Sequence, residues 1–156
     1  MSPMRCSAAL AVGLALAMGA CTKDDPPMPY ACSATDQAGY EQALRAAPAT
    51  VRLPGGVAIS DCLRKVRTDA DLQNLGAVVH VVAEGLAQRV RDGGDVAAAR
   101  QLGYLAAAVD TGAAHSGGIS AELARRVSVA ASGLSEVSPA VSQALTAGQA
   151  AGAQDG

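Results

Sequence analysis

His115 and Ser116 are the adjacent pair in this sequence whose side chains could do nucleophilic chemistry. Asp110 stands five residues earlier, so a nucleophile, a base and an orienting carboxylate can be imagined together. Adjacent side chains rarely reach the geometry that such a set needs. The G-x-S-x-G turn of serine hydrolases is also absent. We therefore interpret this segment as a turn between helices, with a hydrolase as the alternative.

The glycine-rich stretch HSGGIS, residues 115–120, could also offer backbone N–H groups to an anion at the start of the next helix. It has no lysine and no Walker-type spacing, and two glycines are ordinary in a turn. Turn chemistry is the favoured interpretation, and an anion or substrate site is the alternative.

His80 is the other histidine, and apolar residues surround it in AVVHVVAEG. With a helical repeat of 3.6 residues it falls on the polar face, away from the leucine and valine stripe. Glu84 follows one turn later, where the two side chains could pair. We predict a solvent-facing pair, with a general base or ligand as the alternative.

The remaining composition narrows the functional classes. The carboxylates are spread along the chain, mostly at expected helix caps, and no calcium-loop spacing occurs. The net charge of −2 gives no basic field for nucleic acid, and two histidines leave little room for a histidine-rich metal site. With no Phe or Trp and three Tyr, stacking platforms for sugars or single-stranded nucleic acid are scarce. We expect no metal, no cofactor and no enzymatic activity.

The first 20 residues have the pattern of an export signal. Arg5 and the amino terminus supply positive charge, and an apolar run over residues 8–18 follows. The run is too short for a membrane span. An ordinary secretory cleavage after Ala17 is one interpretation of the residues that follow it.

Met18-Gly19-Ala20-Cys21 resembles the lipobox of bacterial lipoproteins, although that family usually has Leu where this chain has Met18. The resemblance covers residues 1–21 only. It implies that the signal is removed before Cys21, that Cys21 carries diacylglycerol, and that the mature protein is anchored to a membrane of the cell envelope. Two or three acyl chains on one cysteine would give stable anchoring.

The other cysteines support this interpretation by their number. Cys6 is lost with the signal, and lipidation of Cys21 leaves Cys32 and Cys62 as an even pair. Cleavage after Ala17 would instead leave three cysteines. We predict a disulfide between Cys32 and Cys62, with free thiols as the alternative, because no further ligands and no Cys-x-x-Cys motif accompany them.

The segment between Cys21 and residue 31 is charged and rich in proline, which predicts a flexible tether. Residues 32–146 should form the folded domain. A short helix is expected over residues 36–47, a small hairpin or an irregular loop over 51–60, and a short helix capped by Ser60 and ending at Arg67.

Longer helices should follow this region. Thr68 and Asp71 resemble a capping box, and an apolar stripe then runs to a stop at Gly93-Gly94. A second helix begins after Asp95 and ends at residue 109. A third covers residues 119–134, with Ile119 and Leu123 on its apolar stripe. The last helix begins at Ser138-Pro139.

These elements predict a mainly α protein: a small antiparallel helical bundle with a disulfide-stapled loop or hairpin region at its N-terminal end. Residues 147–156 lack large apolar side chains and are expected to be disordered. The function expected from the absence of a catalytic set is an extracytoplasmic, lipid-anchored interaction or accessory protein that binds another envelope protein. A small-molecule carrier with an aliphatic pocket is the alternative.

Overall fold

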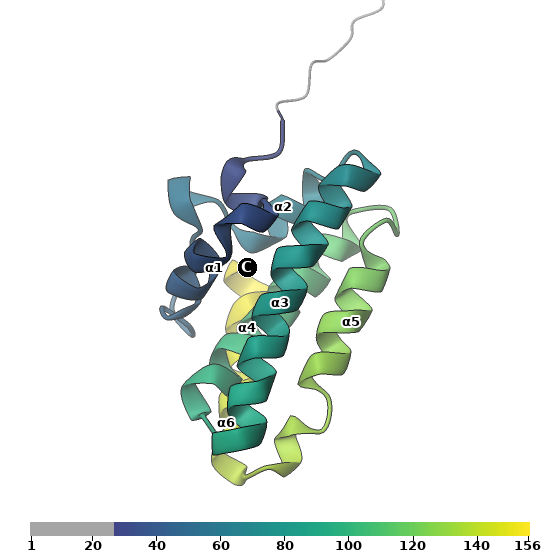
Figure 1. The fold of residues 1–156 in the computed structure, drawn as a ribbon. Coiled ribbons are helices and arrows are strands. Elements are labelled where there is room, and N and C mark those ends of the chain that lie inside the picture. Colours follow the sequence, from purple (N-terminus) through teal and green to yellow (C-terminus); the bar gives the residue numbers. More distant parts are fainter. Residues whose placement is uncertain (1–26) are drawn as a thin grey trace, which may run out of the picture.

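The computed structural model describes residues 27–156, so the predicted signal peptide and the predicted lipidation of Cys21 lie outside the described residues. The described chain is an α-helical bundle, shown in Figure 1, with no β-strand between residues 27 and 156. This confirms the predicted fold class. Its six α-helices are α1 (Gln37–Leu44), α2 (Ile59–Arg64), α3 (Asp69–Gly93), α4 (Val96–Ala114), α5 (Ala121–Ala131) and α6 (Pro139–Asp155). Across residues 27–156, no helix combines the length and apolar character needed to span a bilayer.

The folded domain begins earlier than predicted. A 3₁₀-helix covers Tyr30–Cys32, and the side chain of Ala31 is buried. Met28 also packs against the core. The predicted tether of residues 21–31 is therefore wrong at its C-terminal end, because apolar contacts hold that end against the helices.

Residues 51–57 form a loop with one isolated bridge, between Leu53 and Val57, around the turn Pro54–Gly56. The irregular-loop alternative thus describes this region better than a hairpin. The predicted cap at Ser60 is wrong. Ser60 lies inside α2, whose N-cap is Ala58. The backbone N–H of Ser60 donates to the carbonyl of Gly156 at 2.9 Å, so a distant segment satisfies it.

Local caps set the start of the long helices. The Thr68 hydroxyl accepts from the Asp71 N–H while the Asp71 carboxylate accepts from the Thr68 N–H, which confirms the capping box. Asp95 caps α4 through the Ala98 N–H at 2.9 Å. Ser138 caps α6, with Pro139 in its first turn.

The predicted helix ends were less accurate. α4 continues to Ala114, five residues beyond the predicted end, because Gly112 and Ala113 are buried and Gly112 lies against α2. α5 is shorter than predicted at both ends, and Gly133 with a φ of 75° follows it. Tertiary contacts, which lie outside the reach of local patterns, decide both differences.

The predicted disorder of residues 147–156 is wrong. α6 continues to Asp155, and Gly148 and Gly152 are buried against α4. A Cβ atom added at Gly148 would overlap the carbonyl of Arg100, so the two backbones are in direct contact. Close backbone packing here replaces the large side chains whose absence suggested disorder.

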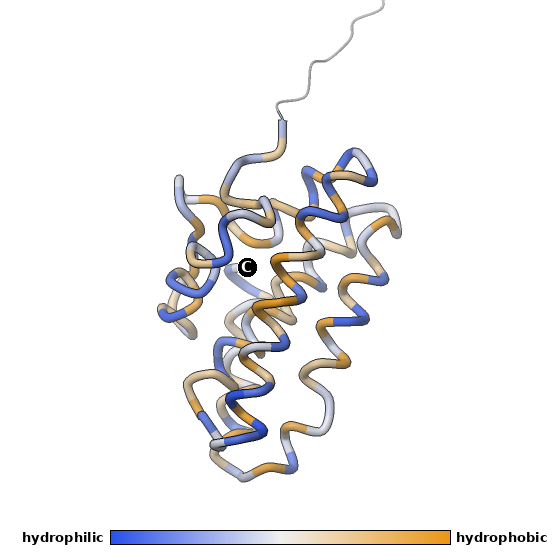
Figure 2. Tube along the Cα trace, viewed as in Figure 1, coloured by the Kyte–Doolittle hydropathy of each residue, from blue (hydrophilic) through white to orange (hydrophobic). Residues whose placement is uncertain are grey.

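α4 is the central element of the bundle and contacts α1, α2, α3, α5 and α6. Figure 2 shows apolar and polar residues alternating along α3 and α5, as expected of amphipathic helices that cover a core. α5 lies beside α3 on one side of the bundle (Figure 1). These two helices position the site described next.

Candidate functional site

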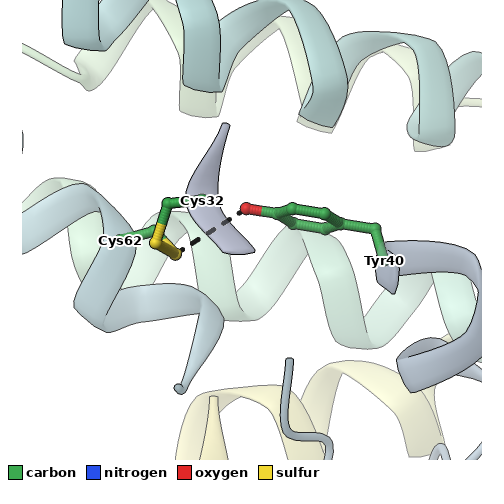
Figure 3. Close-up of a disulfide and its surroundings, with 3 residues drawn as sticks. All are labelled: Cys32, Tyr40 and Cys62. Carbon is green, nitrogen blue, oxygen red and sulfur yellow. Dashed lines mark hydrogen bonds between the residues drawn. A yellow bond between two sulfur atoms is a disulfide. The ribbon is translucent and has the colours of Figure 1, made fainter. Parts of the chain in front are cut away.

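The predicted disulfide joins Cys32 and Cys62, with a Cα–Cα distance of 5.5 Å, and both residues are fully buried. The Tyr40 hydroxyl lies 3.7 Å from the Cys62 sulfur and donates to it (Figure 3). Burial raises the pKa of Tyr40, and the nearby carboxylate of Asp36 adds to the effect. The bridge thus connects the first turn of the domain to α2 inside the core, which gives it a structural role.

The structure does not bring His115 and Ser116 together for catalysis. The Ser116 hydroxyl donates to the Ala113 carbonyl at 2.7 Å and accepts from the Ser120 N–H at 3.1 Å. His115 Nδ1 lies 2.8 Å from the Thr111 carbonyl oxygen. Both side chains therefore close the turn after α4, as the turn interpretation predicted.

Asp110, the third member of that imagined set, is exposed. It lines a shallow recess between α4 and α5 together with Arg125 and Ser128. Neither His115 nor Ser116 lines this recess. The carboxylate has no orienting contact with the histidine within residues 27–156.

The same turn contains the glycine-rich segment. Gly117 and Gly118 have φ values of 63° and 94°, which explains why glycine occupies both positions. Ser120 stands at the start of α5, where its hydroxyl is buried and makes no hydrogen bond within residues 27–156. The glycines thus serve the turn itself.

His80 is exposed, which confirms its prediction on the polar face of α3. Its predicted pairing with Glu84 is wrong, because the Glu84 carboxylate lies 3.5 Å from Arg91 Nη2 instead. His80 lies at the edge of a different feature. It lines an apolar groove between α3 and α5.

This α3–α5 groove has a volume of about 400 Å³. On α3 the groove is lined by three apolar or small residues and two polar ones: Leu72, Gly76 and Ala77, and Gln73 and His80. The α5 side begins just before the helix. It is lined by Ile119, Glu122, Leu123 and Arg126. The groove is therefore a largely apolar channel with polar side chains along its edge.

Ile119 is the most informative residue of the groove. Its side chain is 53% exposed, although the sequence pattern predicted that it would join the apolar stripe of the third helix. Leu123, one turn later, is buried between the helices. An exposed isoleucine beside an apolar depression is the kind of surface that binds a partner.

Two arginines hold the one carboxylate at the α5 edge of the groove. Arg125 makes bonds of 2.8 and 2.9 Å to Glu122, and Arg126 Nε donates to Glu122 at 2.9 Å. The bonds from Arg125, and then those from Arg126, lower the pKa of Glu122 to about 2. The cluster carries a net positive charge of one and keeps it over the whole neutral range.

Sequence reasoning missed the groove because it placed Leu72 and Ile119 in the core. One signal was present. Gly76 and Ala77 are small residues on α3 between larger apolar neighbours, so they leave space beside α5. Nothing in the sequence alone shows that α5 crosses at this position.

The part of the chain between residues 27 and 156 contains no group of three or more His, Cys, Asp or Glu side chains placed to hold a metal ion. A scan against family models, a search of curated proteins and a search of solved structures each found no match to this chain. The α3–α5 groove is accordingly the feature on which a functional proposal can rest.

Proposed function

We propose that this protein is a lipid-anchored accessory protein of the bacterial cell envelope that binds a partner protein through the α3–α5 groove. The observation that carries the proposal is the combination of an apolar channel with the half-exposed Ile119 at its edge. The anchor rests on the lipobox-like sequence before Cys21.

The occupant that fits the groove is an amphipathic helix of the partner. A channel between two helices accepts apolar side chains spaced three and four residues apart along a third helix. Gly76 offers room for this approach, because a Cβ at that position would have only Leu123 Cδ1, at 4.0 Å, within reach. The partner helix would therefore add to the bundle as a further layer.

The charge beside the groove indicates which side chains the partner helix should carry. The cluster of Glu122, Arg125 and Arg126 leaves one positive charge beside the channel. An acidic residue next to the apolar stripe of the partner helix would complement it. Such complementarity mainly sets specificity and the association rate.

A groove-filling substitution tests the docking step. Gly76→Leu places a large side chain at the groove, and its Cβ would meet only the Leu123 side chain, at 4.0 Å, so the fold should persist while partner binding is lost. Gly85→Leu is the matched control: it makes the same change on the same helix, where nothing lies within 4 Å and no groove residue is involved. The measurement is photo-crosslinking in native membranes from a probe at Ala77, read as one discrete adduct.

The proposal predicts an adduct in the wild type and in Gly85→Leu, and its loss in Gly76→Leu. An adduct that survives Gly76→Leu in a folded protein would overturn docking in the groove. Co-purification of a small apolar molecule, displaced by Gly76→Leu, would favour the carrier function instead.

The anchor has its own experiment. Cells fed an alkyne-tagged fatty acid should label the wild-type chain but not Cys21→Ala, whereas the double variant Cys32→Ala/Cys62→Ala should still be labelled. Label that remains on Cys21→Ala would contradict lipidation at this residue.

A further inference from the structure

A second recess lies on another side of the bundle, where α1 meets α3 and α4. Its volume is about 330 Å³, and its lining consists of Glu41, Arg45, Leu86, Arg89 and Gln101. Four of these five side chains are charged or polar, whereas the α3–α5 groove is largely apolar. None of them lines that groove, so the recess is independent of the proposed docking surface.

Gln101 is the unusual residue of this recess. It is only 8% exposed, and its side-chain amide makes no hydrogen bond within residues 27–156. The oxygen and the nitrogen of this amide both remain in contact with solvent, so a ligand in the recess can hydrogen-bond to them in place of water. Gln101 lines the recess, which is where a ligand for its amide can enter.

The two arginines add donors to the same space. Arg45 makes no ion pair within the described part of the chain. Arg89 directs Nε and Nη2 to the Asp95 carboxylate, at 3.0 and 2.6 Å, which leaves its Nη1 group available. Guanidinium groups and a primary amide are the donors that bind a planar carboxylate best.

Glu41 supplies the opposite charge. One of its carboxylate oxygens, Oε1, accepts from Gln37 at 2.8 Å, and the other has no protein donor within residues 27–156. An acidic group at this place disfavours a dianion such as phosphate and accepts hydrogen bonds from an ammonium group. The buried side chain of Leu86 adds an apolar wall.

We propose that this recess, the α1–α3–α4 recess, binds a small zwitterion with an aliphatic side chain, of the α-amino acid class. The carboxylate of the ligand takes the donors of Arg45, Arg89 and Gln101. Its ammonium group faces Glu41, and its side chain contacts Leu86. The volume lies at the small end of the range that ligand pockets occupy, about 300–1,000 Å³.

L-Valine is the probe, added to the purified full chain in detergent micelles. The readout is the shift of the Gln101 side-chain amide signals in ¹H–¹⁵N spectra, with calorimetry for affinity. Saturable binding at about 1 mM or tighter is expected for so few contacts. Arg45→Gln should weaken binding at least about tenfold, whereas Arg126→Gln, an arginine outside the recess, should leave it unchanged.

Two comparisons make the assignment specific. Propionate lacks the ammonium group, so it should bind more weakly than valine in the wild type, and Glu41→Gln should remove that difference. Gln101→Leu should abolish binding, because it removes the amide that bonds to the carboxylate of the ligand.

Several results would overturn the proposal. These are no shift of the Gln101 amide with valine at about ten times the expected dissociation constant, or tighter binding of inorganic phosphate than of valine. Equal affinity for propionate and valine, or binding that survives Arg45→Gln, would do the same. Valine binding that survives Gln101→Leu would also overturn it.

Discussion

Glycine has opposite consequences in two helix pairs of this molecule, α4–α6 and α3–α5. Between α4 and α6, Gly148 and Gly103 bring the backbones together, and an added Cβ at either position would overlap a main-chain carbonyl. Between α3 and α5, the space around Gly76 remains open, and only Leu123 Cδ1 comes within 4.0 Å of an added Cβ.

The difference shows that a small residue alone does not specify close packing. In the α4–α6 pair each glycine lies against main-chain atoms of the facing helix: Gly148 against Arg100 and Gly103 against Leu145. Where the facing residues are Ile119 and Leu123, the helices stay apart and a groove results. The same residue type thus lies in a close backbone contact in one pair and beside an open groove in the other.

The largest effect is expected from adding a methyl group to the α4–α6 interface. Gly148→Ala should lower the free energy of unfolding by about 4 kcal/mol, because the backbones must separate to accommodate it. Gly85→Ala makes the same change on the exposed face of α3 and should raise the free energy of unfolding by about 0.5–1 kcal/mol. Urea denaturation of both variants measures the difference. Equal effects of the two substitutions would contradict direct backbone contact.

A smaller loss is expected from removing the disulfide at the end of the tightly packed region. The bridge closes a loop between residues 30 positions apart. Cys32→Ala/Cys62→Ala should lower stability by about 3 kcal/mol on the chain-entropy model. Thermal unfolding of the wild type with and without reductant should reproduce the loss. A decrease of less than about 1 kcal/mol would mean that helix packing alone holds this end.

The cap at the start of α3 should contribute less. Thr68→Ala removes one half of the capping box, one turn before the groove begins at Leu72, and should cost about 1 kcal/mol. Hydrogen exchange should become faster in the first turn of α3. Thr146→Ala is the control, since that exposed hydroxyl bonds only to the Ser142 carbonyl inside α6. Unchanged exchange in α3 would argue against the cap.

The smallest effect concerns the charge cluster at the groove. Because its partners lower the pKa of Glu122 from 4.5 to about 2, the ionised group stabilises the fold above pH 4.5, and this contribution is lost as the pH falls through 2. The wild type should therefore melt slightly above Glu122→Gln at pH 7, with the difference shrinking below pH 4.5. Glu136→Gln, which breaks no ion pair within residues 27–156, should show no such trend. A constant difference across this range would contradict the pairing.

Most features that depend on neighbours in sequence were predicted correctly, although the predicted cap at Ser60 was wrong. The caps at Thr68, Asp95 and Ser138 form as expected, because each side chain reaches a backbone N–H three residues later. The cysteine pairing followed from counting, since lipidation of Cys21 would leave one pair. These interactions need no knowledge of the fold.

Features that depend on distant segments were predicted poorly. The end of α4 and the order of residues 147–156 both rest on contacts with helices far away in sequence. The groove has the same origin, because it exists only where α5 lies beside α3. The pairing of His80 with Glu84 was wrong for a simpler reason: Arg91 provides a permanent charge for the same carboxylate.

The sequence by itself determined the helical class, the starts of α3, α4 and α6, and the pair of cysteines available for a bridge. Periodicity and capping act within a few residues, so they can be recognised without coordinates. The tertiary structure alone decided which glycines lie against backbone atoms, which isoleucine stays exposed and which side chains line each recess. Each of these depends on the distance between helices, and that distance is set by the side chains that face one another across the bundle.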